Sequence, residues 1–282
     1  MMETKKIVQE HNFVFKKKFG QNFITNSQVL KDIVEKAEIT SDDIVLEIGP
    51  GAGGLTVELA KYAKEVIAIE IDTSLEPILD QTLKGYRNIE VIFEDVLKWD
   101  LKSFLQERYA GESIKVVANL PYYITTPILM KLLEERLPLK SITIMVQKEV
   151  ADRIQAQPGG KDYGAITLAV AYYADAKIVM TVPPHVFIPA PKVVSAVLHL
   201  KMKEKAAIPE GKHLSEEEER KLFQIISAAF EQRRKTLVNA LGNKGITSKE
   251  KIKAALSQME LPEDIRGERL SLEEFIELSA KL

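Results

Sequence analysis

The sequence predicts an α/β fold with a mostly parallel sheet, followed by a small domain made only of helices. Between residues 44 and about 202, short apolar runs of strand length alternate with segments of helical periodicity, as in a sheet covered by helices. After residue 213, apolar residues recur only at helical spacing, and capping signals precede the segments. These two patterns set the order of the elements.

Seven apolar runs are predicted to be strands. Helical segments separate the early runs, which favours parallel pairing because parallel neighbours need a long crossover connection. Only a short proline-rich loop at residues 183–191 separates the last two runs, which predicts an antiparallel end to the sheet. The runs are residues 44–48, 66–69, 89–93, 114–118, 142–146, 176–182 and 193–201.

The helical domain follows a charged segment that contains Pro209 and Gly211. Ser215 and Glu218 have the spacing of a capping box, and Gly242 is the expected end of the helix that they begin. Two more helices are expected, from Thr247/Ser248 toward Met259 and from Ser271 to about Lys281. The predicted division is a sheet domain at 1–202 (with a basic, helical segment at 1–43), a linker at 203–213 and a helical domain at 214–282.

The composition excludes several classes of site. The 282 residues include no Cys, so disulfides and thiolate metal sites are excluded, and the four His are scattered without ligand spacing, so no metal is expected. No run is long enough to span a membrane and no leader is apparent, so a cytoplasmic protein with no membrane partner is expected. The net charge of −2 does not by itself indicate a nucleic-acid partner.

A glycine-rich turn follows the first strand and contains Gly49 and Gly51. Glycines there let the backbone approach a ligand and present N–H groups at a helix N-terminus. Glu70 ends the second strand, 19 positions after Gly51, where a carboxylate can accept hydrogen bonds from ribose hydroxyls. The GxGxG spacing is not the full GxGxxG, and the turn alone leaves both a nicotinamide dinucleotide and S-adenosylmethionine open.

Polar residues also follow the third and fourth strands. Asp95 could cap a helix or meet the amino group of a bound adenine. The sequence Asn119-Leu120-Pro121-Tyr122 could be a simple strand end with a proline stop. It could also hold an exocyclic amine, since the Asn oxygen and a carbonyl beside the proline are acceptors and the Tyr ring can stack on a base. Because parallel strands end at one edge of a sheet, we expect these residues and the glycine turn to meet there.

Two basic clusters stand out from the nearly neutral chain. They are Lys16-Lys17-Lys18 and Arg233-Arg234-Lys235. Such runs are usually solvated surface, but they can also make local phosphate contacts.

Seven strands with an antiparallel end are typical of Rossmann-like methyltransferases, whereas dinucleotide dehydrogenases generally have six parallel strands. The chain also resembles the bacterial small-subunit ribosomal RNA adenine N6-dimethyltransferases, the kasugamycin-sensitivity group. The similar segments are Lys-Lys-Phe-Gly-Gln-Asn-Phe-Ile (17–24), Leu-Glu-Ile-Gly-Pro-Gly (46–51), Glu-Asp-Val-Leu-Lys (94–98), Asn-Leu-Pro-Tyr-Tyr-Ile-Thr-Thr-Pro-Ile (119–128), Val-Gln-Lys-Glu-Val-Ala (146–151), Val-Phe-Ile-Pro-Ala-Pro-Lys-Val-Val-Ser-Ala-Val (186–197) and Ala-Phe-Glu-Gln-Arg-Arg-Lys-Thr-Leu (229–237).

The resemblance implies S-adenosylmethionine as the methyl donor and assigns roles to the candidate residues. The donor pocket would be formed by Asn22 and Ile24 as lining, Gly49 and Gly51 near the methionine part, Glu70 at the ribose and Asp95 at the adenine, with Asn119 also in contact with the donor. Asn119 with Leu120-Pro121 would hold the target amine, and Tyr122 and Phe187 would stack on either side of the base.

The implied reaction is dimethylation of two adjacent adenines in a hairpin loop near the 3′ end of 16S rRNA, within the 30S subunit or its precursor, by a monomer. Three alternatives remain. The antibiotic-resistance branch performs the same chemistry on large-subunit RNA, but Pro127 and the segment Gln-Arg-Arg-Lys-Thr (232–236) favour the small-subunit branch. A non-catalytic assembly or transcription factor could keep the fold, and a dinucleotide oxidoreductase is disfavoured by Asp95 and the seventh strand.

Overall fold

The structure is a computed structural model that describes residues 7, 10–11, 13, 15–16, 19–203 and 214–282. Contacts divide the chain into two units, one formed by residues 1–151 and 176–202 and the other by residues 152–175 and 203–282. The predicted boundary at residue 202 is also a boundary between these units. Residues 152–175 group with the C-terminal helices, although the sequence-based division placed them in the sheet domain. Most of the predicted linker, residues 204–213, lies outside the described residues.

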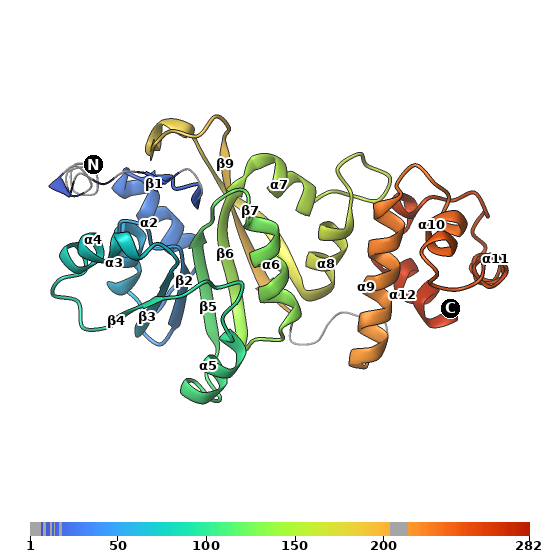
Figure 1. Ribbon diagram of the computed structural model, residues 1–282, viewed down its shortest axis with the longest axis horizontal. Helices are drawn as coiled ribbons and strands as arrows, with labels where there is room; N and C mark the ends of the chain where they lie inside the picture. Colours follow the sequence, from blue (N-terminus) through green and yellow to red (C-terminus); the bar gives the residue numbers. More distant parts are fainter. Residues whose placement is uncertain (1–6, 8–9, 12, 14, 17–18, 204–213) are drawn as a thin grey trace. The chain divides into compact units, whose positions relative to one another are not determined.

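The first unit is built on a seven-stranded sheet in the order β4-β3-β2-β5-β6-β9-β7 (Figure 1). The strands from β4 to β6 pair in parallel, and β9 pairs antiparallel with β6. Their bounds are Ile44–Ile48 (β2), Glu65–Glu70 (β3), Ile89–Phe93 (β4), Ile114–Asn119 (β5), Leu139–Gln147 (β6), Ala174–Val182 (β7) and Ser195–Met202 (β9). The seven strands and the antiparallel end confirm the fold predicted from the sequence.

The register of the parallel strands brings their carboxyl ends level. Ile48 of β2 lies opposite Ile69 of β3 and Ala118 of β5, and Glu70 lies opposite Phe93 of β4. The loops after these strands therefore start from one edge of the sheet, as in other open α/β sheets that bind ligands there.

Helices of the first unit bury apolar faces against this sheet. The helix α2 (Ser27–Lys36) begins at Asn26, whose side chain accepts hydrogen bonds from the first N–H groups, and packs beside α3 (Gly54–Ala60). Their buried side chains form one cluster with residues from the middle of the sheet. The other helices are α4 (Glu76–Thr82), α5 (Leu101–Arg108), α6 (Thr125–Glu134) and α7 (Lys148–Ile154), the last of which extends into the second unit.

The second unit is helical. Its helices are α8 (Ala165–Tyr173), α9 (Glu216–Glu231), α10 (Leu237–Asn243), α11 (Lys249–Gln258) and α12 (Leu272–Lys281). The predicted capping signals are confirmed, because the side chains of Ser215, Ser248 and Ser271 accept the N-terminal N–H groups of α9, α11 and α12. Residues of α8 belong here because Tyr173 stacks on Phe223 of α9 with ring centroids 5.6 Å apart.

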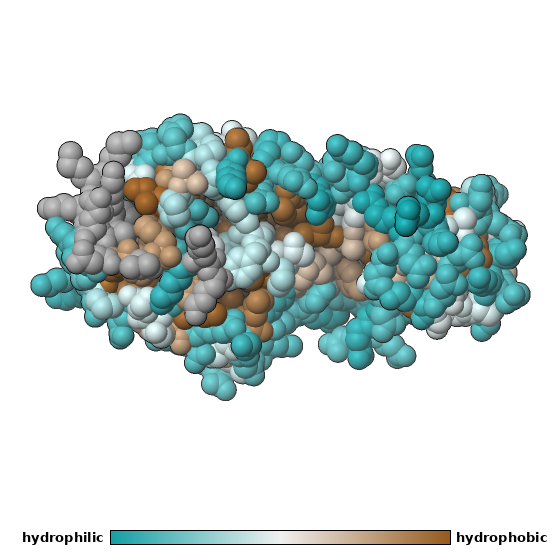
Figure 2. All heavy atoms as spheres, turned by 45° about the horizontal axis from the view of Figure 1, so that its top comes forward, coloured by the Kyte–Doolittle hydropathy of each residue, from teal (hydrophilic) through white to brown (hydrophobic). Residues whose placement is uncertain are grey.

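One helix end was predicted wrongly. Gly242 lies inside α10, and the long helix stops earlier, at Glu231. A turn follows, and Thr236 then caps α10 by accepting from the N–H of Asn239. The second basic cluster therefore lies on a turn and not within a continuous helix. The face of this unit visible in Figure 2 is mostly hydrophilic. Of the helices described, none is both long and apolar enough to cross a membrane.

Candidate functional site

One cavity at the carboxyl edge of the sheet brings together the residues predicted for the donor and for the target amine. Its lining includes residues from the loops after β2, β3, β4 and β5 and from the segment that precedes α2. The predicted residues in this lining are Asn22, Ile24, Gly49, Gly51, Glu70, Asp95, Asn119, Leu120, Pro121 and Tyr122.

The glycine turn has a backbone that requires glycine. Gly49 and Gly51 have φ values of 74° and 58°, in the left-handed region that side chains disfavour. A Cβ atom at Gly51 would also lie 2.8 Å from the ring of Phe23. Phe23 thus packs so closely on Gly51 that no side chain fits there.

Glu70 is tied to this turn. One carboxylate oxygen accepts from the N–H of Gly51 at 3.2 Å, and the other accepts from the N–H of Asp72 at 2.9 Å. Burial raises the pKa of Glu70, and these two backbone hydrogen bonds oppose that effect. The carboxylate is therefore held in one orientation, and its remaining lone pairs can accept from a ligand hydroxyl.

Glu47 is a second buried carboxyl in the lining. It is 1% exposed, and Oε2 has no hydrogen-bond partner among the described residues. Its pKa is raised to about 8, mainly by burial and in smaller part by the nearby Glu70, while Thr56 acts in the opposite direction. Glu47 is therefore protonated at neutral pH, and a cationic ligand bound beside it would favour its ionised form.

All charged side chains in the described lining are acidic: Glu47, Glu70, Glu94 and Asp95. Because burial keeps Glu47 protonated at neutral pH, the negative potential of the cavity comes from the other three acidic groups. This potential favours a cation over a pyrophosphate, and so favours S-adenosylmethionine over a nicotinamide dinucleotide.

Asp95 stabilises a turn after β4 and also lines the cavity. One oxygen accepts from the N–H of Leu97 at 3.1 Å and stabilises a turn, and the other lies 3.5 Å from the ammonium of Lys98. The carboxylate still lines the cavity and keeps acceptor capacity toward it.

Asn119 stands at the end of β5, where its amide nitrogen donates to the main-chain oxygen of Asn22 at 2.9 Å. The carbonyl of Pro121 already accepts from the N–H of Ile124 at 3.1 Å and from the hydroxyl of Thr125 at 3.2 Å. The acceptors that remain for an amine are therefore the side-chain oxygen of Asn119 and the carbonyl oxygen of Leu120.

The ring of Tyr122 is anchored at its hydroxyl, which lies 2.8 Å from the hydroxyl of Ser195 on β9. Burial raises the pKa of Tyr122, with the hydrogen bond to Ser195 acting in the opposite direction. The phenol stays neutral at physiological pH, and its ring has a fixed position in the lining.

Phe187 is not brought to this cavity. It is 3% exposed and belongs to the core cluster under α2 and α3. Its strand, β8 (Phe187–Ile188), pairs antiparallel with β1 (Phe23–Ile24), so Phe187 lies opposite Ile24. Phe187 is therefore buried in the core cluster and is not among the lining residues, and its stacking role stays a prediction.

The basic clusters differ in their contacts. Lys16 donates to the carboxylate of Asp72 at 2.6 Å, whereas Lys17 and Lys18 lie outside the described residues. On the turn after α9, Arg233 donates to the carbonyl of Lys161 at 2.9 Å and lies 3.5 Å from Glu268. Arg234 and Lys235 are exposed there.

Sequence reasoning missed Gln21, which lines the cavity, and Asp72 and Ser195, which hold the lining residues Gln21 and Tyr122. No local pattern marks Gln21 or Ser195, because their partners are 51 and 73 positions away. Asp72 had a weak signal, since it stands two residues after Glu70 at the same strand end.

The family of ribosomal RNA adenine dimethylases matches residues 12–280. The chain belongs to this family. A ribosomal RNA small subunit methyltransferase A from Lachnoclostridium phytofermentans is 50% identical over 98% of this chain and 94% of that relative. The protein of the same name from Clostridioides difficile is 48% identical over 98% of this chain and 93% of that relative.

Solved structures agree with this assignment. A dimethyladenosine transferase from Plasmodium falciparum has a TM-score of 0.74 and 28% identity, covering 91% of this chain and 95% of its own. The 23S rRNA methyltransferase ErmE has a TM-score of 0.66 and 27% identity, covering 92% and 99%. As a member of the ribosomal RNA adenine dimethylase family, the chain is an enzyme that uses S-adenosylmethionine as its methyl donor.

Proposed function

We propose that this enzyme dimethylates the N6 atoms of two adjacent adenines in a hairpin loop near the 3′ end of 16S rRNA. The observation that carries the proposal is the meeting of an acidic cavity with two acceptors on its lining, the side-chain oxygen of Asn119 and the carbonyl of Leu120, that accept no hydrogen bond from the described part of the chain. The small-subunit methyltransferases that are about half identical over the full chain support the choice of RNA.

The acidic half of the cavity fits the donor. S-adenosylmethionine supplies a methyl group on a positively charged sulfur, and the carboxylates of Glu70, Glu94 and Asp95 stabilise that charge. Gly49 and Gly51 allow the backbone to approach the methionine part, Glu70 accepts from the ribose, and Asp95 accepts from the adenine amino group. Asn22 and Ile24 close the cavity from the N-terminal side.

The other half fits a target amine. The exocyclic nitrogen of adenine donates its lone pair into the ring and is a poor nucleophile. Acceptors at Asn119 and Leu120 hold its N–H groups so that the nitrogen becomes pyramidal and its lone pair points toward the donor. Catalysis is then positioning together with electrostatic stabilisation, and no general base has to act before methyl transfer.

The target adenine has to leave its stack to enter the cavity. Tyr122 is the ring that we assign to stack on the extruded base, because Ser195 fixes its hydroxyl and its ring belongs to the lining. For a second stacking ring, Phe187 stays the residue predicted, although it is buried in the core cluster in this structure.

Binding to the RNA needs positive surface outside the acidic cavity. We assign phosphate contacts to the basic clusters, at Lys17 and Lys18 in the N-terminal segment and at Arg234 and Lys235 on the turn after α9. The enzyme would act as a monomer in the cytoplasm, on the 30S subunit or its precursor.

One labelling experiment tests the substrate. Protein and tritiated S-adenosylmethionine are incubated with 30S subunits, and separately with 50S subunits, from strains that lack the respective methylation, and the labelled nucleotides are mapped. We expect N6,N6-dimethyladenosine at two adjacent positions of 16S rRNA. Label in 23S rRNA instead would transfer the proposal to the antibiotic-resistance branch, and no label in either would favour a non-catalytic factor.

A further inference from the structure

The donor cavity is bounded on one side by the segment Phe19–Ile24, here called the N-terminal wall. This wall contains the two residues of β1 and begins with Phe19 in a 3-10 conformation, and it is held by contacts with parts of the chain distant in sequence. Phe23 packs with Phe13 and Phe15, at centroid distances of 5.9 and 5.3 Å, and covers Gly51. Anything that fixes the wall therefore also shapes the cavity.

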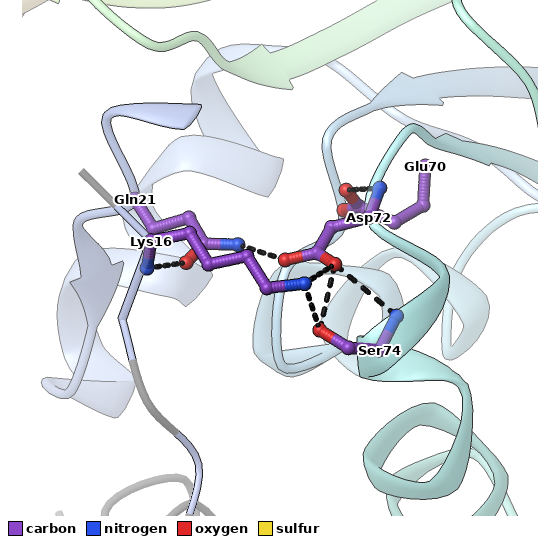
Figure 3. Close-up of polar contacts among 5 residues, drawn as sticks. All are labelled: Lys16, Gln21, Glu70, Asp72 and Ser74. Carbon is purple, nitrogen blue, oxygen red and sulfur yellow. Dashed lines mark hydrogen bonds and ion pairs between the residues drawn. The ribbon is translucent and has the colours of Figure 1, made fainter. Parts of the chain in front are cut away.

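A network of polar contacts centred on Asp72 ties this segment to the end of β3 (Figure 3). One carboxylate oxygen of Asp72 accepts from the ammonium of Lys16 at 2.6 Å, and the other accepts from the side-chain amide of Gln21 at 2.8 Å. The side-chain oxygen of Gln21 in turn accepts from the N–H of Lys16 at 2.9 Å. Lys16 and Gln21 thus both donate to the carboxylate of Asp72.

Asp72 is well placed to hold such an anchor. Its side chain is 2% exposed and that of Lys16 is 36% exposed, so the ion pair is largely shielded from water. Burial alone raises the pKa of Asp72, but the hydrogen bonds from Lys16, Ser74 and Gln21 outweigh it and lower the pKa below its usual value. The carboxylate is therefore charged at neutral pH.

Further hydrogen bonds connect the wall and Asp72 to the proposed donor site and to the proposed amine site. The N–H of Asp72 donates to Glu70, the proposed ribose acceptor, at 2.9 Å. At the other end of the wall, the carbonyl of Asn22 accepts from Asn119, the proposed amine holder. Lys16, a member of the first basic cluster, is thus engaged inside the protein.

We propose that Asp72 is a positioning residue that retains the methyl donor, by holding the N-terminal wall in place through Lys16 and Gln21. The inference rests on the proposed donor site in this cavity. Without the anchor on Asp72, the wall moves away more often and the donor dissociates faster, although no group that contacts the donor has been removed.

The chain offers a matched control for Asp72. Asp100 also precedes a short helical segment and also accepts from the N–H and the hydroxyl of a serine, in its case Ser103, but it does not line or border the cavity. Asp72 accepts the same pair of hydrogen bonds from Ser74. A comparison of Asp72→Ala with Asp100→Ala separates anchoring of the wall from simple loss of a cap.

Three quantities are measured on the full chain: the Kd of S-adenosylmethionine by calorimetry, its dissociation rate by stopped flow, and hydrogen exchange of the amides in Phe19–Ile24. For Asp72→Ala we expect a Kd about tenfold higher, mostly through faster dissociation, and faster exchange in the wall. Asp100→Ala should match the wild type in all three. Wild-type dissociation and exchange in a folded Asp72→Ala protein would overturn the inference.

A second set of variants covers the case in which Asp72→Ala fails to fold. Asp72→Asn keeps a capping side chain but removes the charge opposite Lys16, and Lys16→Met removes the other partner. Each should speed donor dissociation, and the double variant should be no faster than the more affected single variant, because both remove one interaction. Lys16→Arg keeps the charge and should restore most of the retention. Fully additive effects would contradict the proposal.

Glu70→Ala distinguishes failure of this inference from failure of the donor site. If Glu70→Ala weakens donor binding while the Asp72 and Lys16 variants bind and release the donor as the wild type does, the donor site stands and the positioning role is wrong. If all of these variants bind the donor normally, the donor lies elsewhere and both proposals fail.

Discussion

The side-chain nitrogen of Asn119 donates to the main-chain oxygen of Asn22 at a distance of 2.9 Å. This hydrogen bond joins the end of β5 to the N-terminal wall across 97 positions of sequence. It also fixes which way the amide of Asn119 faces, because the nitrogen is used inside the protein and the oxygen is left for a ligand. The wall that bounds the donor cavity thus also orients the acceptor for the target amine.

The first prediction concerns the ribose contact of Glu70. Glu70→Ala should weaken the binding of S-adenosylmethionine by about 1–3 kcal/mol, because the ribose hydroxyls no longer have a charged acceptor. Calorimetry measures this, with Glu112→Ala as a control at an exposed carboxylate that pairs with Lys64. Unchanged donor affinity in a folded Glu70→Ala protein would count against the assignment.

The second prediction separates the two functions of Tyr122. Tyr122→Ala removes the stacking ring and should lower methyl transfer by about 10–100-fold, equivalent to about 1–3 kcal/mol of stacking. Tyr122→Phe keeps the ring but lacks the hydrogen bond with Ser195, so its effect should be smaller and similar to that of Ser195→Ala. Single-turnover rates with 30S subunits measure these effects. Equal reductions for Tyr122→Ala and Tyr122→Phe would show that the hydroxyl, and not the ring face, is what matters.

The third prediction concerns RNA affinity. Changing Lys17, Lys18, Arg234 and Lys235 to Gln should weaken binding to 30S subunits and flatten the dependence of log affinity on log salt. The slope should fall by about 0.7–0.9 for each phosphate that the protein no longer neutralises. Lys16 and Arg233 stay unchanged because their side chains have partners within the protein.

The control for this experiment replaces Lys251 and Lys253 of α11, which removes positive charge from the same protein at another place. Donor affinity should be the same in all of these variants. A wild-type salt slope after removal of the four clustered charges would identify the clusters as ordinary solvated surface.

The fourth prediction follows from Glu47, whose pKa burial raises from 4.5 to about 8. Between these values the folded protein keeps a proton that the unfolded chain has lost, so the stability contributed by the neutral acid is present below pH 4.5 and is lost as the pH rises toward 8. The loss is about 1.4 kcal/mol for each pH unit in that window.

Glu47→Gln removes this titration while keeping the shape of the side chain. The free energy of unfolding of Glu47→Gln, minus that of the wild type, should therefore rise as the pH increases from 4.5 to about 8. Urea titrations at several pH values in this range measure it. Parallel pH profiles would show that Glu47 is not a neutral acid in the folded protein.

Local signals were enough to predict much of this molecule. The site residues follow strands, and those strands are recognisable as apolar runs of strand length. Helix starts such as Ser215 and Ser271 are recognisable because their side chains accept a hydrogen bond from the N–H three residues later. The meeting of Gly49, Glu70 and Asn119 followed from a general property of parallel sheets, which end their strands at one edge.

The remaining features depend on contacts that no local pattern encodes. The anchor between Lys16 and Asp72 joins residues 56 positions apart, and a lysine in a basic run gives no sign that it is paired. Phe187 was assigned to the base by resemblance, but the pairing of β1 with β8 places it in the core. Gly242 was taken as a helix end because glycine often stops helices, but the stop came earlier, before the cap at Thr236.

The amine-holding role of Asn119 is tested most directly by product analysis with Asn119 variants. Wild type, Asn119→Ala and Asn119→Asp are each incubated with S-adenosylmethionine and unmethylated 30S subunits, and the 16S rRNA is digested and examined by mass spectrometry. The aspartate keeps an acceptor oxygen, but it has no N–H to donate to the carbonyl of Asn22 and sets its charge against that carbonyl, so its oxygen loses the orientation that holds the amine. We predict two dimethylated adenines with the wild type and none with either variant, although both variants still bind the donor and the subunit. Dimethylation by Asn119→Ala at a rate near that of the wild type would contradict the account.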